Sequence, residues 1–320
     1  MDYRIIEGDC IEGMRRLEGQ SVHCVVTSPP YFGLRDYGHD GQIGLEASPE
    51  AFVAKLVEVF REARRVLRDD GTLWLNLGDS YSGSGKGAWG SDEAREANRH
   101  RVKETYVPTR AESPLAGKVP PGLKAKDLIG IPWRVAFALQ ADGWYLRQDI
   151  IWHKPNPMPE SVRDRCTKAH EYIFLLSKGP RYYFDAEAMK EPSVTNDPRR
   201  PYTSKGAKDL DGRSEWKSGQ ARDKGDFSLR NKRSVWTVTT KPFKGAHFAT
   251  FPPELIRPCI LAGCPKDGTV LDPFGGSGTT AQVALEEGRR AVLCELNPDY
   301  IALVRKRIEG LQLRIEFTGL

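Results

Sequence analysis

The stretch VHCVVTSPPY, residues 22–31, decides how this chain folds. Its first five residues are mostly apolar, which is typical of a buried strand. Pro29 and Pro30 have no backbone N–H to continue a sheet, so they end the strand in a rigid turn. Ser28 and Tyr31 are therefore expected at the carboxyl end of a strand, where open α/β sheets bind their ligands.

The residues of this turn suit the handling of a flat base that carries an exocyclic amino group. The Ser28 hydroxyl and the Pro29 carbonyl can accept the two hydrogens of the amine, and the Tyr31 ring can stack on the face of the base. We predict Ser28, Pro29, Pro30 and Tyr31 as catalytic residues. A purely structural turn would explain the two prolines equally well, so this stretch alone leaves both interpretations open.

A second stretch, VLDPFGGSGTT at residues 270–280, is rich in glycine, which lets a backbone approach a ligand closely. About 23 residues after Asp272, a predicted strand ends at Glu295. An acidic residue in that position can accept hydrogen bonds from both hydroxyls of a ribose, as in dinucleotide-binding folds. The glycines do not fit Gly-x-Gly-x-x-Gly, however, and the Asp-Pro-Phe lead is foreign to that motif, which argues against a nicotinamide cofactor.

Together the two stretches resemble the paired signatures of the S-adenosylmethionine-dependent DNA amino-methyltransferases. The target-amine motif comes first and the cofactor motif last, as in the permuted group usually called beta. The resemblance covers most of the chain. It implies an α/β, Rossmann-like methyltransferase fold with about seven mostly parallel strands, helices on both faces, and one antiparallel strand at an edge.

The resemblance also implies which residues bind S-adenosyl-L-methionine. Asp272 is expected to meet the ammonium of its methionine part, Glu295 the ribose and Leu296 the adenine. Asp9 matches the family's acidic residue that contacts the adenine, although aspartate is equally favoured as a helix N-cap. The complete predicted cofactor set is Asp9, Cys10, Phe251, Asp272, Pro273, Phe274, Gly276, Ser277, Gly278, Thr279, Glu295 and Leu296.

Serine in the first position of the amine motif is typical, within this family, of methylation at cytosine N4. Asp or Asn there is typical of adenine N6. We therefore predict a DNA (cytosine-N4)-methyltransferase that acts on a flipped-out base by direct transfer and needs no metal, with adenine N6 as the alternative. An RNA or protein-amide methyltransferase and an inactive DNA-binding relative also remain open. Attack by Cys259 at cytosine C5 is rejected, because the chain lacks the Glu-Asn-Val companion motif.

The net charge of +5 is unevenly distributed. Residues 80–127 hold nine Lys and Arg against six Asp and Glu, and residues 191–240 hold eleven against seven. Such basic segments suit a polyanion. We predict a catalytic domain made of residues 1–190 and 241–320, with a mobile insertion at 82–127, and a target-recognition region at 191–240.

The predicted DNA contacts are basic side chains, which phosphate binding requires. They are Arg35, Lys154, Arg163, Arg165, Arg199, Arg200, Lys232 and Arg233. Surface charge on a proline-rich turn is the competing interpretation near Lys154, and disorder is the competing interpretation for residues 191–240. Duplex DNA is the expected partner, while a cognate restriction endonuclease and a homodimer are left open.

The length and composition set further bounds. A chain of 320 residues can bury a substantial core. No apolar run approaches the roughly 18 residues of a membrane span, and the N-terminus lacks a secretory signal pattern. The six cysteines include no Cys-x-x-Cys pair, so neither a zinc site nor a disulfide framework is indicated. These features predict a cytoplasmic protein.

Overall fold

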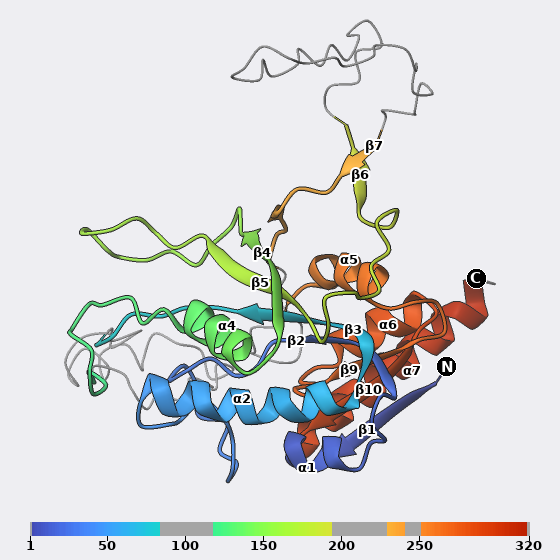
Figure 1. Ribbon diagram of the computed structural model, residues 1–320, viewed down its shortest axis with the longest axis horizontal. Coiled ribbons are helices and arrows are strands. Elements are labelled where there is room, and N and C mark those ends of the chain that lie inside the picture. Colours follow the sequence, from blue (N-terminus) through green and yellow to red (C-terminus); the bar gives the residue numbers. More distant parts are fainter. Residues whose placement is uncertain (1, 84–117, 194–228, 241–250, 319–320) are drawn as a thin grey trace, which may run out of the picture.

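The computed structural model describes residues 2–83, 118–193, 229–240 and 251–318. Eight strands form one sheet with the spatial order β1-β10-β9-β2-β3-β5-β4-β8 (Figure 1). Their bounds are β1 (Tyr3–Glu7), β2 (Val22–Thr27), β3 (Leu67–Leu77), β4 (Tyr145–His153), β5 (His170–Ser177), β8 (Val235–Thr237), β9 (Thr269–Asp272) and β10 (Arg290–Glu295).

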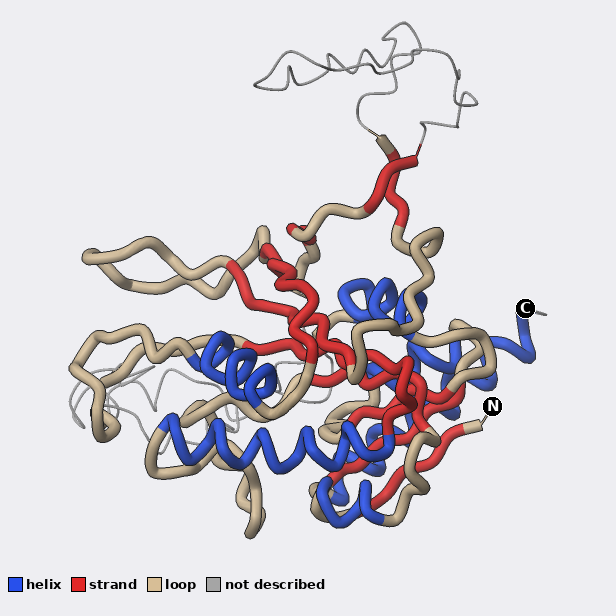
Figure 2. The backbone as a smooth tube through the Cα atoms, in the orientation of Figure 1, coloured by secondary structure: helices blue, strands red, loops and turns tan. Residues whose placement is uncertain are grey.

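Six helices in the described residues cover the two faces of this sheet (Figure 2). One face carries α1 (Cys10–Arg15), α2 (Pro49–Val66) and α4 (Ile131–Ala141), and the other carries α5 (Pro253–Gly263), α6 (Thr279–Glu286) and α7 (Pro298–Thr318). Helix α2 starts directly after Ser48, whose hydroxyl accepts the N–H of Ala51 at 3.2 Å as an N-cap.

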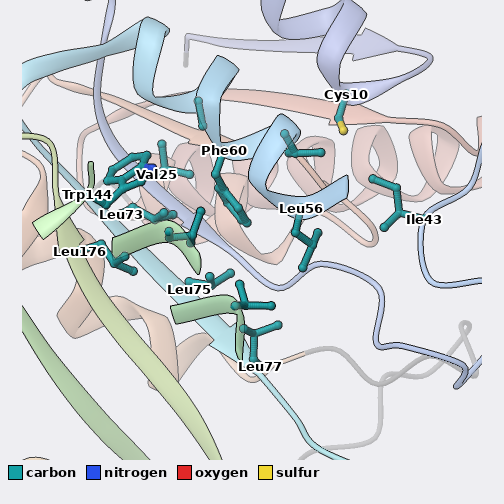
Figure 3. Packing of buried hydrophobic residues seen from close by; sticks show 14 of the residues in the cluster. Cys10, Val25, Ile43, Leu56, Phe60, Leu73, Leu75, Leu77, Trp144 and Leu176 are labelled. Carbon is teal, nitrogen blue, oxygen red and sulfur yellow. The ribbon is translucent and has the colours of Figure 1, made fainter. Parts of the chain in front are cut away.

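The strands contribute side chains to both layers, because successive side chains of a strand point to opposite faces. On β2, Val25 joins the core under α2, while Cys24 and Val26 join the core under α5 and α6. Figure 3 shows the first of these cores, where Leu56 and Phe60 of α2 pack with strand residues. Burial on both faces explains the continuous apolar character of β2.

The predicted α/β fold is confirmed, with eight strands where about seven were expected. The prediction of an antiparallel edge strand is wrong: β5 is antiparallel, but it lies inside the sheet between β3 and β4 and is antiparallel to both. A loop of residues 154–169 follows β4, and β5 then returns beside β4 as its antiparallel partner. The edge strand β8 is parallel to β4.

A small antiparallel ribbon, β6 (Lys190–Pro192) and β7 (Leu229–Asn231), stands away from the main sheet (Figure 1). β6 contains the start of the predicted recognition region, whereas β8, near the end of that region, belongs to the main sheet. Most of the region lies outside the described residues, including Arg199 and Arg200. Most of the predicted insertion at 82–127 lies outside them too. Its described ends meet, because Ser82 and Asp127 are joined by a backbone hydrogen bond of 2.8 Å. The division into domains stays a prediction.

Within the ranges that the structure describes, no helix has both the length and the apolar character that crossing a membrane requires.

The close packing of α5 on the sheet gives a stability prediction. A Cβ added at Gly263 would lie 2.5 Å from Thr72 Oγ1 and 2.5 Å from Trp74 Nε1, both buried. We expect Gly263→Ala to lower the free energy of unfolding by about 1–3 kcal/mol or more, as overpacked cores do. Urea denaturation measures this change.

The matched control is Gly310→Ala on α7, where an added Cβ meets no atom within 4 Å. Alanine favours a helix over glycine by up to about 1 kcal/mol, so this variant should be as stable as the parent or more so. Equal midpoints for both variants would contradict the packing described here.

Candidate active site

A cleft of about 190 Å³ lies at the carboxyl edge of the sheet, beyond the ends of β1, β2, β9 and β10. The sheet places β2 beside β9, with Val25 opposite Leu271, although the two strands lie near opposite ends of the chain. The two sequence motifs therefore meet in one place. All the strands around the cleft are parallel, so each contributes the residues that follow its last position.

The cleft collects nearly all the residues predicted for catalysis and cofactor binding. Gly278 is the exception, since it does not line the cleft. The lining residues predicted from sequence are Ser28, Pro29, Pro30, Tyr31, Asp9, Cys10, Phe251, Asp272, Pro273, Phe274, Gly276, Ser277, Thr279, Glu295 and Leu296. Their roles stay predictions, but their convergence on one cleft is a property of the fold.

Asp272 joins the two motifs physically. Its buried carboxylate accepts hydrogen bonds from the hydroxyls of Thr27 and Thr280, each at 2.6 Å, and from the N–H of Phe274 at 3.0 Å. Burial raises the pKa of Asp272 to about 7, although these three donors act to lower it. The role of Thr27 was missed, because no local pattern pairs residues 245 positions apart.

The glycine-rich turn after β9 forms part of the cleft wall. Gly276 and Gly278 have φ values of +50° and +79°, which side chains rarely adopt. A Cβ at Gly278 would also lie 2.9 Å from Val304 Cγ1 of α7. The Ser277 hydroxyl is buried and has no hydrogen-bond partner among the residues that the structure describes. A buried polar atom without a partner in a cleft is suited to a polar ligand.

Glu295 is fixed from both sides at the end of β10. Its carboxylate accepts the N–H of Gly276 at 2.6 Å and the N–H of Asn297 at 2.8 Å. Burial raises its pKa, and these backbone donors oppose the rise. One carboxylate oxygen can accept more than one hydrogen bond, so this side chain still has capacity for ribose hydroxyls.

Asp9 has the N-cap role that the sequence suggested. Its side chain accepts the N–H of Ile11 at 2.9 Å and of Glu12 at 3.0 Å at the start of α1. It also lines the cleft. A contact with adenine is therefore compatible with the cap, and that contact remains a prediction.

Tyr31 is held by polar groups on two strands, β3 and β5. Its hydroxyl donates to Glu171 Oε2 at 2.7 Å and lies 3.3 Å from Asn76 Oδ1. Gly78, just after β3, leaves room for the ring, since an added Cβ would lie 2.4 Å from Tyr31 Cε2. Burial, followed by the charge of Glu171, raises the pKa of Tyr31 well above its usual value. Tyr31 therefore remains a hydrogen-bond donor.

The predicted DNA contacts are spread over several elements. Arg35 lines the cleft. Lys154 is ion-paired with Glu171, and its ammonium lies 4.2 Å from the centre of the Trp152 ring. On the loop between β4 and β5, Arg163 is exposed, while Arg165 bonds to Glu160 and lies 3.8 Å over the Tyr81 ring.

Two further predicted DNA contacts, Lys232 and Arg233, lie just before β8. Arg233 is exposed, and the Lys232 ammonium lies 5.3 Å from the Trp236 ring. Contact with DNA stays a prediction for all of these residues.

Sequence reasoning missed several residues at the cleft and beneath it. His39 and Tyr300 line the cleft, and Asn76, Gly78 and Glu171 hold Tyr31. No motif marks them, because each is defined by a neighbour distant in sequence. The only available signal was position, since Gly78 and Glu171 adjoin predicted strand ends.

The raised pKa of Asp272 predicts how stability depends on pH. Its pKa is about 7 in the folded chain against an ordinary 3.8, so folding favours the protonated form. The protonated Asp272 side chain therefore contributes to the free energy of unfolding. This contribution is fully present below about pH 4 and is lost as the pH rises to about 7, and it amounts to a few kcal/mol at most. The Asp272→Asn substitution should therefore lower the free energy of unfolding, relative to the parent, by more at pH 5 than at pH 8.

Urea midpoints of both proteins without cofactor, at pH 5 and pH 8, measure that difference. A stability difference between parent and variant that is the same at both pH values would show that Asp272 titrates normally.

The chain was compared with known proteins at the level of sequence. Residues 22–306 match the model of the N6/N4 DNA methylase family. The type II methyltransferase M.Cfr9I of Citrobacter freundii is 49% identical over 306 residues, which is 96% of this chain and 87% of that protein. M.SmaI of Serratia marcescens is 48% identical over 305 residues, 95% of this chain and 90% of that protein.

Solved structures of DNA methyltransferases are also similar to this chain. The PvuII DNA methyltransferase (cytosine-N4-specific) superposes with a TM-score of 0.61 at 18% identity, over 96% of this chain and 86% of that one. A putative DNA modification methylase of Thermus thermophilus, TTHA0409, complexed with S-adenosyl-L-methionine, has a TM-score of 0.55 at 25% identity, over 95% and 94% of the two chains. The first likeness shows the shared fold.

The family match spans most of the chain, and relatives of nearly half identity cover almost all of it. The two motifs that carry the match meet in one cleft. This chain belongs to the N6/N4 DNA methylase family.

Proposed function

We propose that the protein transfers a methyl group from S-adenosyl-L-methionine to the exocyclic N4 of a cytosine flipped out of duplex DNA. DNA methyltransferase activity and the cofactor follow from the family, and the choice of base is our proposal. One observation supports methyl transfer within this cleft: the hydrogen bond from Thr27 to Asp272 brings the Ser-Pro-Pro-Tyr turn beside the glycine-rich turn. A methyl donor held by one turn is then adjacent to an amine held by the other.

The residues of the cleft fit the cofactor. Glu295 has acceptor capacity for ribose hydroxyls, and Leu296 offers an apolar surface for adenine. Asp272 provides negative charge for the methionine ammonium. The Ser277 hydroxyl, which lacks a partner among the described residues, suits the polar end of the methionine part. When bound, the cofactor supplies a methyl group that its sulfonium already activates.

The task of the protein is then to prepare the amine. The amine nitrogen of a base is a weak nucleophile, because its lone pair is delocalised into the ring. Hydrogen bonds from its two N–H groups to Ser28 Oγ and to the Pro29 carbonyl would concentrate that lone pair on nitrogen. Holding the two reacting groups in line is itself worth several kcal/mol of the barrier.

The target base must first leave the helix, at a cost of a few kcal/mol. Stacking on the ring of Tyr31 offsets part of that cost, since a base on an aromatic ring contributes about 1–3 kcal/mol. The ring is already fixed against Gly78 and Glu171, so little further ordering is needed when the base arrives.

Serine in the amine motif supports N4 of cytosine over N6 of adenine, which is the second candidate. The relatives named as type II methyltransferases support a restriction-modification role with a cognate endonuclease. The endonuclease, a homodimer and a cytoplasmic location stay predictions.

The cofactor site gives one test. We expect Glu295→Ala to weaken binding of S-adenosyl-L-methionine by about tenfold or more, because it removes charge-assisted hydrogen bonds to the ribose. Asp272→Ala should act in the same direction through the ammonium. Calorimetric titration of the folded variants measures both affinities.

Glu309→Ala, which removes an exposed acid on α7, is the matched control and should bind like the parent. Parent affinity in a folded Glu295→Ala protein would place the cofactor elsewhere.

The base assignment gives another test. After incubation of duplex DNA with the protein and cofactor, nucleoside mass spectrometry should detect N4-methylcytosine. Ser28→Ala should abolish most of this product, whereas Ser21→Ala, an exposed serine at the opposite end of β2, should not. N6-methyladenine alone would overturn the base but keep the amine chemistry, and 5-methylcytosine would defeat both.

A further inference from the structure

One face of helix α7 packs against the start of α6, where the glycine-rich turn ends. A Cβ added at Gly278 would lie 2.9 Å from Val304 Cγ1, and the Arg307 guanidinium donates a hydrogen bond to Thr279 Oγ1 at 2.6 Å. Val304 and Arg307 are three positions apart, so they lie on the same face of α7. This face therefore contacts two consecutive residues, the N-cap and the first residue of α6.

The hydrogen bond between Arg307 and Thr279 has a fixed direction. A guanidinium carries only donors, so Thr279 Oγ1 must be the acceptor. A threonine hydroxyl also has one proton of its own, and within the described ranges that proton has no acceptor. Thr279 is 5% exposed and lines the cleft, so an acceptor bound in the cleft would complete its hydrogen bonds.

The surroundings of Thr279 offer further hydrogen-bond donors. Ser277 is 6% exposed and lines the same cleft, and its hydroxyl has no partner in the described part of the chain. The first turn of α6 carries backbone N–H groups that no side chain caps in that part, and such groups attract anions. Ser277, Thr279 and the start of α6 therefore form one group of donors in the cleft wall, which suits a carboxylate.

Arg307 also brings a positive charge to this wall. Burial lowers the pKa of its guanidinium to about 10, and the charge of Glu286 opposes that change. The group therefore stays protonated at neutral pH. An anion bound at Thr279 would interact favourably with this charge, which water screens only weakly at a buried position.

We propose that Arg307 is a positioning residue that holds Thr279 as a donor to the carboxylate of the cofactor's methionine part. The inference rests on the proposed function, in which S-adenosyl-L-methionine occupies this cleft with its ammonium at Asp272. The ammonium and the carboxylate share one carbon atom of the ligand, so their partners must be close together. Asp272 meets this requirement, because it accepts the hydroxyl of Thr280, the residue after Thr279, at 2.6 Å. Arg307 acts through Thr279, since it does not itself line the cleft.

Binding of two ligands to Arg307→Met tests this role. S-adenosyl-L-methionine carries the carboxylate, whereas decarboxylated S-adenosylmethionine lacks only that group. Calorimetric titration of the folded variant should show an affinity for the first ligand about tenfold lower than in the parent, the loss expected for a hydrogen bond with a charged group. Affinity for the second ligand should not fall, because it has no carboxylate to contact Thr279.

The matched control is Arg305→Met, which removes an exposed arginine from the same helix and should bind both ligands like the parent. A role of Arg307 in the fold alone would weaken both ligands equally in Arg307→Met, and that result overturns the proposal. Parent affinity for S-adenosyl-L-methionine in Arg307→Met overturns it too.

A double-mutant cycle tests whether Arg307 acts through Thr279. Thr279→Val keeps the shape of the side chain and removes the hydroxyl that links Arg307 to the ligand, so it should also weaken only the ligand with a carboxylate. Adding Arg307→Met to Thr279→Val should then lower that affinity little further. An undiminished effect of Arg307→Met in the Thr279→Val background contradicts the proposal.

If Arg307→Met does not fold, Arg307→Gln repeats the comparison, because it keeps a polar side chain and removes the charge. The loss must again be confined to S-adenosyl-L-methionine, and an equal loss for both ligands overturns the inference. The proposed function fails separately: a parent protein that methylates no exocyclic amine defeats it, whereas a carboxylate-specific loss in Arg307→Met still supports the role of Arg307.

Discussion

The site depends on the hydrogen bonds that Asp272 accepts from Thr27 and Thr280, both 2.6 Å long and buried. One threonine ends β2 and the other lies in the first turn of α6. A single carboxylate thus fastens the turn that would hold the amine to the turn that would hold the cofactor. Removing it would leave buried hydroxyls without partners, which is costly. The two motifs lie near opposite ends of the chain, but this contact and the pairing of β2 with β9 bring them together in space.

The direction of β5 has a consequence for the same site. Because β5 is antiparallel to β3 and β4, its first residues lie at the edge where the parallel strands end. Glu171, second in β5, thereby reaches the hydroxyl of Tyr31, while Gly78 follows β3 and accommodates the ring. A parallel strand would place that acid at the opposite edge. The interior antiparallel strand therefore supplies the carboxylate that accepts the hydrogen bond of the Tyr31 hydroxyl.

The sequence predicted those features of the site that depend on residues close together in the chain. The glycine-rich turn after β9 and the acid that ends β10 each depend on neighbours in sequence, and each appears where expected. The roles of Thr27 and Glu171 could not be predicted, because their partners lie 245 and 140 residues away. The place of the antiparallel strand was missed for a similar reason. Whether a strand joins an edge or enters the interior depends on pairing between strands, which composition does not encode.

The central claim is that both motifs serve one methyl-transfer site. A crystal structure of the protein with S-adenosyl-L-methionine bound tests it most directly. The account predicts the ribose hydroxyls at Glu295, the methionine ammonium near Asp272, and the methyl group facing the turn formed by Ser28, Pro29 and Tyr31. A cofactor bound outside this cleft, or one whose methyl group faces away from that turn, would contradict the account.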